Sequence, residues 1–210
     1  MARYVTTTLP YVNAAPHLGH ALEFVEGDCY VRALRLKGEE VFFNIGTDEH
    51  GAKIAKRAEE SGKIPKDFVD FYANQFKEFA KRLNISEDTF LRTTDPKHEK
   101  AAQEMWKRCA DAGDIYKGAY EVKYCTGCEL EKTDSELSEG RCPLHPNLDI
   151  EIRTEENYYF KFSKYQDALL RHYESNPEFV IPSERLGEIK SFVAAGLKDF
   201  SISRPADKLS

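Results

Sequence analysis

The sequence predicts an α/β protein with a parallel sheet, joined to a smaller α+β region that is rich in cysteine. The first part rests on the alternation of strand-like and helical segments through residues 3–113, because strands separated by helices pair in parallel. The second rests on a change near Gly113, after which short β-like pieces and clustered cysteines replace the long amphipathic segments. The 210 residues are enough for one large domain or two small ones, and the 41% hydrophobic content is typical of a globular protein.

Three strands alternate with helices in the first region. Residues 66–83, for example, carry aromatic and leucine side chains at spacings of three and four, which is typical of a helix with one buried face. Strands are expected at 3–8, 40–46 and 89–92, and helices at 17–37, 51–61, 66–83 and 95–113. Ligands of open parallel sheets bind beyond the carboxyl ends of the strands, so the segments after the first two strands are the candidate site.

Beyond Gly113 the expected elements are shorter. Strands are expected at 157–162 and 198–203, and helices near 164–175 and 184–195. Tyr159, Lys161 and Ser163 alternate with two phenylalanines. This alternation predicts that the first of these strands continues to Ser163 and has one buried face.

The five cysteines divide into two groups. Cys29 and Cys109 lie on apolar stripes with helical spacing, so we expect both to be reduced core residues. The stripes are Leu18, Leu22, Val25, Cys29, Ala33 and Leu36 in one helix, and Ala102, Met105, Cys109 and Ala112 in another. The remaining cysteines are odd in number, which fits a cytosolic metal site better than a disulfide framework.

Cys125-Thr-Gly-Cys128 and Cys142-Pro-Leu-His145 form two pairs of metal-binding side chains, separated by a polar spacer of 13 residues. Two such pairs suit the tetrahedral preference of zinc. We therefore expect Cys125, Cys128, Cys142 and His145 to bind one structural zinc, since four protein ligands leave no open position for catalysis. Free thiols or another soft metal are the alternatives.

A strand, a Pro/Asn turn and the sequence His17-Leu18-Gly19-His20 at the start of a helix indicate a nucleotide triphosphate site. The first amides of a helix lack internal partners and attract phosphate, and residues three apart can reach the same ligand. Gly19 has no Cβ, so a flat base could approach the backbone there. The alternative is two surface histidines near a helix start, because such short motifs often match by chance.

Asp48 follows the second strand and precedes a helix. A carboxylate there can pair with an ammonium group or cap the helix, and the residues alone leave both interpretations open. Asn13 likewise either binds phosphate or makes the turn. The neighbouring His50 is expected to cap a helix or to support the site from behind.

Composition limits the partners. A formal net charge of −6 is unlike that of a general nucleic-acid binder, so any RNA contact must come from a local patch. No apolar run approaches the length of a membrane span, and Met1-Ala2-Arg3 leads directly into a strand rather than a signal peptide. We therefore expect a cytoplasmic protein with no membrane partner.

Several motifs together resemble the first half of a class I aminoacyl-tRNA synthetase, and the methionyl-tRNA synthetases are the most similar. They are Thr6, Leu9-Pro10-Tyr11, Asn13, His17-Leu18-Gly19-His20, Gly46-Thr47-Asp48-Glu49-His50-Gly51 and the Cys/His pairs. The resemblance implies the first half of a Rossmann-like catalytic domain at 1–113. It also implies an inserted connective peptide at 114–198, with a zinc knuckle at about 122–148, and a return segment at 199–210.

The resemblance also implies an activity, methionine–tRNA ligase, which uses ATP with Mg²⁺ to make methionyl-adenylate and transfers the methionine to the acceptor end of tRNA. His17 and His20 would be the catalytic contacts to the ATP phosphates, with Gly19 and Asn13 also binding ATP. The carboxylate of methionine is already ionised at neutral pH, so no general base is needed. In the same family, Leu9, Tyr11 and Asp48 would bind methionine, and Arg204 is a candidate contact at the adenylate.

The second half of the family's catalytic domain, with its lysine-rich K-M-S-K-S loop, and the anticodon-binding domain are missing. Lys161-Phe162-Ser163-Lys164 mimics that loop, but it lies inside the insertion and is interpreted as a chance match. The chain is thus expected to be inactive unless a C-terminal half or second chain completes it. A branched-chain synthetase fits less well, because its editing domain would not fit in the insertion. The remaining alternative is a non-catalytic, zinc-containing RNA-binding or regulatory module derived from a synthetase.

Overall fold

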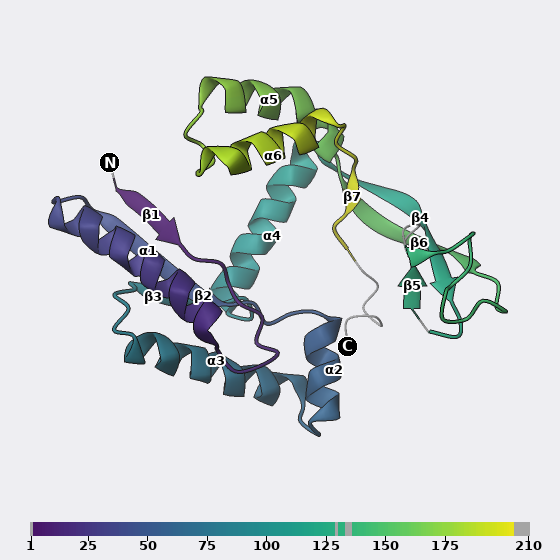
Figure 1. The fold of residues 1–210 in the computed structure, drawn as a ribbon, viewed down its shortest axis with the longest axis horizontal. Helices are drawn as coiled ribbons and strands as arrows, with labels where there is room; N and C mark the ends of the chain where they lie inside the picture. Colours follow the sequence, from purple (N-terminus) through teal and green to yellow (C-terminus); the bar gives the residue numbers. More distant parts are fainter. Residues whose placement is uncertain (1, 129, 133–135, 204–210) are drawn as a thin grey trace. The chain divides into compact units, whose positions relative to one another are not determined.

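The computed structural model describes residues 2–128, 130–132 and 136–203 (Figure 1). The chain divides into two compact units, and the boundary falls between Trp106 and Lys107, inside helix α4, Pro96–Asp111. Each unit is described by itself below. Among the described residues, no helix combines the length and the hydropathy needed to cross a membrane.

The first unit is built on a three-stranded parallel sheet, as the alternation of strands and helices predicts. The strands β1 (Arg3–Thr6), β2 (Val41–Thr47) and β3 (Thr89–Arg92) lie in the order β1-β2-β3, with Arg3 opposite Val41 and Asn44 opposite Thr89. Helix α1 (Leu18–Leu36) connects the first two strands, and α2 (Ala52–Glu60) and α3 (Pro65–Arg82) connect the second and third. The predicted order of elements in this unit is confirmed.

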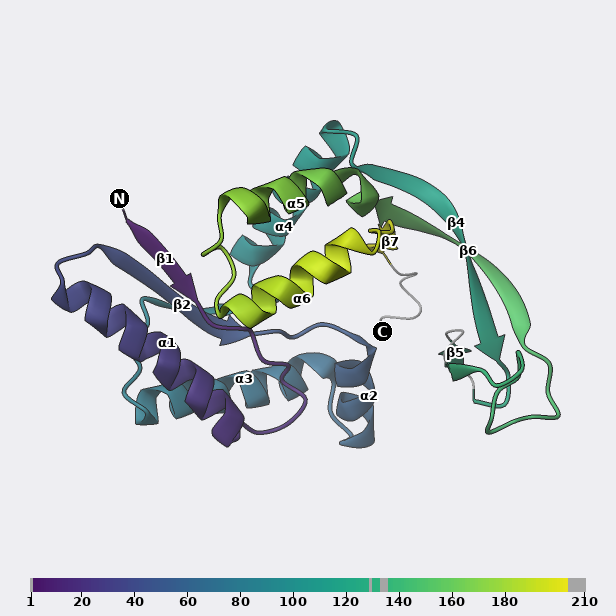
Figure 2. The same ribbon diagram turned by 45° about the horizontal axis from the view of Figure 1, so that its top comes forward.

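The core of this unit lies where β2 meets α1 and α3, which run beside the sheet in Figures 1 and 2. Phe43 and Ile45 of β2, Phe24 of α1 and Phe76 of α3 are fully buried. Burying an aliphatic or phenylalanine side chain contributes roughly 1.5–3 kcal/mol relative to leaving it exposed. This packing fixes the carboxyl ends of β1 and β2, where the candidate site lies.

The predicted core stripe of α1 is wrong. Leu18, Leu22 and Leu36 are 87%, 62% and 89% exposed, and Cys29 is exposed as well. The buried face of the helix instead contains Phe24, Asp28, Val31 and Leu34. Both faces of α1 carry apolar residues at helical spacing. The prediction chose the face without a charged residue, because an aspartate on a helix face usually indicates exposure to solvent.

Asp28 can be buried because its carboxylate is fully bonded. Its Oδ1 accepts hydrogen bonds from the backbone N–H and the hydroxyl of Ser86 at 2.8 and 2.5 Å, and its Oδ2 pairs with Arg32 at 2.6 Å. These partners lower the pKa of Asp28, although burial opposes them with the largest single effect. Asp28 therefore ties α1 to the segment before β3.

The stripe predicted for α4 is also not a core face. Met105 is 63% exposed, Cys109 is half-buried and no described residue of the helix is buried.

The second unit is an antiparallel sheet with a helical pair. A long ribbon joins β4 (Ile115–Cys125) to β6 (Glu151–Phe160), with Ile115 opposite Phe160, and β5 (Leu130–Lys132) and β7 (Phe200–Ser201) extend it on either side (Figures 1 and 2). The helices α5 (Gln166–Ser175) and α6 (Ser183–Ala194) share a small core. The buried members of that core are Tyr173, Leu186, Val193 and Leu197.

The predicted helices of this unit are confirmed, but the strand extension to Ser163 is wrong. The strand stops at Phe160, and Phe162–Tyr165 form a 3₁₀ turn, η2. Ser163 bonds Asp199 through its N–H and its hydroxyl at 3.1 and 2.7 Å. Partners distant in sequence thus end the strand, and the local alternation cannot reveal them.

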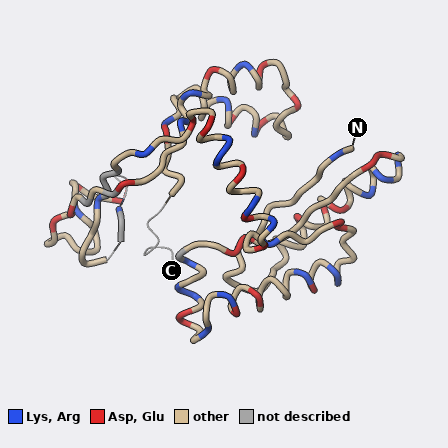
Figure 3. Tube along the Cα trace, turned by 180° about the vertical axis from the view of Figure 1, so that it is seen from behind, with Lys and Arg blue, Asp and Glu red and all other residues tan. Residues whose placement is uncertain are grey.

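Lys164, in the K-x-S-K segment, has a partner within the second unit. Its ammonium group pairs with the buried carboxylate of Asp114 at 2.5 Å, and the hydroxyl of Tyr165 donates to the other oxygen of Asp114 at 2.5 Å. These two hydrogen bonds lower the pKa of Asp114. In both units, acidic and basic residues alternate along the chain trace, and the formal net charge of the sequence is −6 (Figure 3).

Candidate functional site

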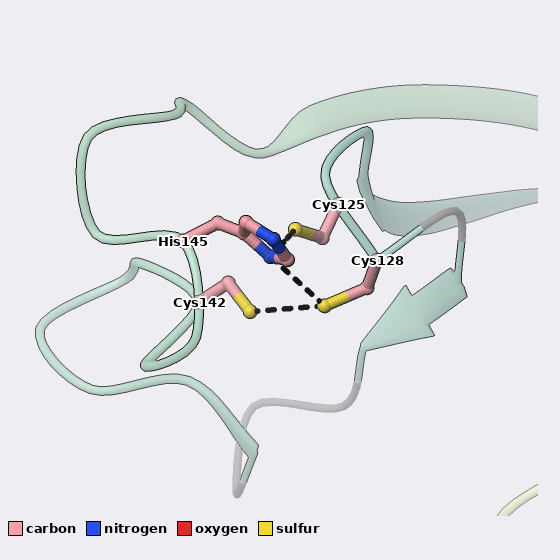
Figure 4. Close-up of side chains that lie close together, drawn as sticks. All are labelled: Cys125, Cys128, Cys142 and His145. Carbon is pink, nitrogen blue, oxygen red and sulfur yellow. Dashed lines mark hydrogen bonds between the residues drawn. The ribbon is translucent and has the colours of Figure 1, made fainter.

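The second unit holds a Cys/His cluster at the end of its ribbon (Figure 4). Cys125 ends β4, Cys128 lies in the turn that follows, and Cys142 and His145 lie in the segment before β6. The four donor atoms all lie within 4.8 Å of one another, and Cys125 and Cys142 are buried. The structure therefore brings together the four residues that the sequence predicted as metal ligands.

The spacing of the donors fits a single ion. The Sγ of Cys128 lies 3.5 Å from that of Cys142 and 3.2 Å from Nδ1 of His145, and the Sγ of Cys125 lies 3.7 Å from the same nitrogen. Sulfur ligands about 2.3 Å from a tetrahedral zinc lie about 3.8 Å apart, so small adjustments would accommodate the ion. With four protein donors and no open position, such a site is structural.

Two features of the cluster concern the space beside His145 and the protonation of the Cys128 thiol. A Cβ at Gly127 would lie 2.5 Å from Cγ of His145, so only glycine lets the ring lie over the turn. Burial raises the pKa of Cys128, and the neighbouring Cys142 and Cys125 raise it further, to about 11. A metal ion would displace that proton, because thiolates are the ligands that zinc binds.

In the first unit, His17 and His20 form the N-terminal cap of α1. Nδ1 of His17 accepts a hydrogen bond from the N–H of Gly19 at 3.1 Å, and Nδ1 of His20 accepts one from the N–H of His17 at 3.2 Å. The rings stack with their centroids 3.8 Å apart. A Cβ at Gly19 would lie 2.9 Å from Cε1 of His17, which makes glycine the residue that fits between them.

This cap determines the hydrogen-bonding state of both rings. A neutral imidazole whose Nδ1 accepts carries its proton on Nε2, so each ring has one N–H left to donate. Burial lowers the pKa of His20, and the nearby His17 lowers it further, against the opposing effect of Glu23. The edge contact with Phe76, at 5.0 Å between centroids, is part of that burial.

Asp48 lies beside the loop that follows β1. Its backbone N–H donates to the carbonyl of Pro10 at 2.9 Å, and its carbonyl accepts from the N–H of Val12 at 3.3 Å. Asp48 and the 57%-exposed Tyr11 thereby form a parallel bridge, and Leu9 is half-buried just before it. The structure therefore brings Tyr11 and Asp48 together, at the same end of the sheet as the start of α1.

The carboxylate of Asp48 is not a helix cap. Gly51, and not Asp48, is the N-cap of α2. Oδ1 of Asp48 accepts a hydrogen bond from the hydroxyl of Thr93 at 3.3 Å, and within the described part of the chain no cation pairs with it. Nε2 of His50 lies 3.3 Å from the backbone carbonyl of the same Thr93, so His50 contacts the residue whose hydroxyl bonds Asp48.

An ion-pair network next to Asp48 was not anticipated from the sequence. The fully buried side chain of Glu49 pairs with Arg92, from Nε to Oε1 at 2.6 Å and from Nη2 to Oε2 at 2.7 Å, and the same Nη2 pairs with Asp70 at 2.6 Å. The hydrogen bond with Glu49 is the main reason that the pKa of Arg92 is raised. Glu49 and Asp70 lie 43 and 22 positions from Arg92 in sequence, so no local pattern could connect the three residues.

The remaining predicted residues have simpler outcomes. Asn13 is half-buried in the segment between β1 and α1, which leaves its proposed ATP contact a prediction. Arg204 lies outside the described residues.

The fold and these motifs define a class I tRNA synthetase. The family model described as "tRNA synthetases class I (M)" matches residues 3–149 and 136–208, and the chain belongs to this family. The methionine–tRNA ligase of Thermosynechococcus vestitus is 47% identical over 201 residues, which are 95% of this chain and 38% of that protein. The corresponding ligase of Streptomyces coelicolor is 45% identical over an alignment of 212 positions, which covers 97% of this chain and 39% of that protein.

Solved structures agree. The Mycobacterium tuberculosis methionyl-tRNA synthetase in complex with methionyl-adenylate matches with a TM-score of 0.83 and 40% identity, over 97% of this chain and 40% of that one. Its apo form matches with a TM-score of 0.66 and 38% identity, over 97% and 39%. The resemblance seen in the motifs is therefore confirmed, and the chain spans about two fifths of the length of these relatives.

Proposed function

We propose that this chain is the N-terminal part of a methionine–tRNA ligase. The observation that carries the proposal is the carboxylate of Asp48, which is held beside Tyr11 without a cation partner among the described residues. An unpaired carboxylate at the carboxyl end of a parallel strand is suited to bind an ammonium group. The relatives' names and the methionyl-adenylate bound to a similar structure support methionine as the source of that group.

The reaction proposed here is activation followed by transfer. The carboxylate oxygen of methionine attacks the α-phosphorus of ATP, a new C–O–P bond forms, and the bond to the β-phosphate oxygen breaks to release pyrophosphate. Asp48 binds the ammonium group, and Leu9 and Tyr11 line the pocket of the side chain. The Nε2–H groups of His17 and His20 donate to the phosphates as charge develops.

The other parts of the chain have supporting roles in this proposal. Asn13 and Gly19 contact ATP, which brings its own Mg²⁺, and Arg204 contacts the adenylate. Cys125, Cys128, Cys142 and His145 hold a structural zinc that keeps the turns of the second unit together near the acceptor end of tRNA. Residues 1–113 form half of the catalytic domain, 114–198 the insertion, and 199–210 the return segment.

Methionine-dependent exchange of pyrophosphate into ATP tests the proposal. We expect the 210-residue chain to give exchange near background, and the chain extended by the second half of a relative to be active. Contacts to the leaving pyrophosphate are expected from the second half, and each such contact is typically worth about 10²–10³ in rate.

An extended chain that folds and binds zinc but shows no exchange with methionine would contradict the proposal. Zinc-dependent RNA binding by that inactive protein would favour a non-catalytic module instead. Strong exchange by the 210 residues alone would contradict only the need for a second half.

A further inference from the structure

We propose that Thr93 is a positioning residue that orients the carboxylate of Asp48 toward the amino group of the substrate. This inference rests on the proposed function, because it concerns how the same site discriminates in favour of an amine. Thr93 immediately follows β3, and it is 8% exposed.

The backbone of Asp48 is fixed by two hydrogen bonds. Its N–H donates to Pro10 at 2.9 Å, and its carbonyl accepts from Val12 at 3.3 Å. The remaining freedom of the residue lies in the two side-chain torsions. Whatever sets those torsions also sets the direction in which the carboxylate can accept an ammonium group.

The hydroxyl of Thr93 is placed to orient this side chain. Oγ1 of Thr93 accepts the backbone N–H of Glu49 at 2.8 Å and lies 3.3 Å from Oδ1 of Asp48. Since the amide occupies a lone pair of the oxygen, the hydroxyl proton is free to be donated to Asp48. The described residues supply no further hydrogen bond to Asp48's carboxylate, and Oδ2 remains available to a ligand.

The hydroxyl of Thr93 is itself held in place by its neighbours. The N–H of Thr93 donates to the carbonyl of Thr47 at 3.2 Å, which continues the pairing of β2 and β3. Glu49 cannot move away, because its buried carboxylate is bonded to Arg92, to Thr47 at 2.7 Å and to Thr94 at 2.6 Å. Arg92, the arginine of this network, donates its side-chain hydrogen bonds to Glu49 and Asp70 and makes none to Asp48 among the described residues.

The test compares two ligands on the full chain: methionine, and the desamino analogue 4-(methylsulfanyl)butanoate. The ratio of their dissociation constants, followed by NMR titration, reports recognition of the amine alone. We expect Thr93→Val to reduce the preference for methionine about tenfold, the loss typical of a hydrogen bond to a charged group. Thr93→Ser, which keeps the hydroxyl, should restore the preference.

Thr94→Val is the matched control, because the hydroxyl of Thr94 bonds Glu49 but not Asp48. It should leave the preference unchanged. If Thr93→Val does not fold, Thr93→Ala takes its place in the same comparison.

A purely structural role for Thr93 would weaken both ligands equally, and this outcome would overturn the inference. The inference would also fail, with the proposed function intact, if Asp48→Ala lost the preference and Thr93→Val kept it. A wild-type chain without any preference, or an Asp48→Ala variant that keeps it, would overturn the inference together with the role proposed for Asp48.

Discussion

At the scale of single residues, the acidic side chains of the first unit differ in what they bind. Asp28, Glu49 and Asp70 each pair with an arginine, whereas in the described part of the chain Asp48 has only the hydroxyl of Thr93. A paired carboxylate stabilises the fold. An unpaired carboxylate at a strand end is available to a ligand, and this contrast supports the proposal that Asp48 contacts the substrate.

Substituting Asp48 tests this contrast. In the extended chain, Asp48→Ala should abolish methionine-dependent exchange, because losing the partner of a charge in a closed site costs on the order of 2–5 kcal/mol. The melting temperature should change little, since Gly51 is the N-cap of α2. A variant with full exchange and a lowered melting temperature would show that Asp48 serves the fold rather than the substrate.

His20 should make stability depend on pH. Burial and His17 lower its pKa in the folded chain, whereas the unfolded chain retains the ordinary value of about 6.5. Below that value the unfolded state binds more protons than the folded state, so this contribution to stability is complete above about pH 6.5 and is lost as the pH falls. A protonated Nδ1 can no longer accept the N–H of His17.

The measurement is the melting temperature between about pH 7.5 and about pH 5.5, where wild type should lose stability on acidification. His20→Asn keeps an acceptor near the N–H of His17 but does not titrate, so its melting temperature should fall less. Groups that do not contact His20 are the same in both proteins, so the difference between the two curves reports His20 together with its contact with His17. Parallel curves would contradict the role given to His20.

At the scale of elements, periodicity identified the helices but not always their buried faces. The strands of the parallel sheet and the helices between them were predicted from alternation and spacing, and the structure confirms them. The stripe containing Leu18 and Cys29 was predicted to be buried and is exposed. The face of α1 that is buried includes Asp28, whose partner Ser86 is 58 residues away.

Gly127, in the turn between β4 and β5, is expected to affect metal binding. Gly127→Ala would place a methyl group 2.5 Å from the ring of His145, so the ring or the turn must move. We expect the purified variant to bind zinc more weakly than wild type, by competition with a chromophoric chelator. Cys128→Ser should lose the metal altogether, since it removes a ligand.

Thr126→Ala is the control, because residue 126 lies in the same turn and offers no atom to the cluster. Wild-type affinity in Gly127→Ala would show that the ring of His145 can be accommodated without this glycine. Full zinc content in Cys128→Ser would contradict the ligand assignment itself.

At the scale of the whole molecule, the chain has two units, each with a separate hydrophobic core. The candidate substrate residues belong to the first unit and the Cys/His cluster to the second. The relatives are more than twice as long as this chain, which covers 38% and 39% of two of them. Activity is therefore a property expected of the completed protein, as the exchange experiment is designed to show.

The sequence by itself determined the order of elements, the parallel sheet and the Cys/His cluster, and its motifs carried the resemblance to the family. These depend on local spacing: a helical period, a glycine between two histidines, and two Cys/His pairs with matched intervals. Such signals lie within a few residues of one another, so they can be read along the chain.

Only the tertiary structure decided which face of α1 is buried, where β6 ends, and that no cation among the described residues pairs with Asp48. Each of these depends on partners far apart in sequence, such as Arg92 with Glu49 and Thr93 with Asp48. A charged side chain is stable inside a protein only when it is paired or hydrogen-bonded there. The fold brings the two partners together, and the periodicity of the sequence does not predict which residues will pair.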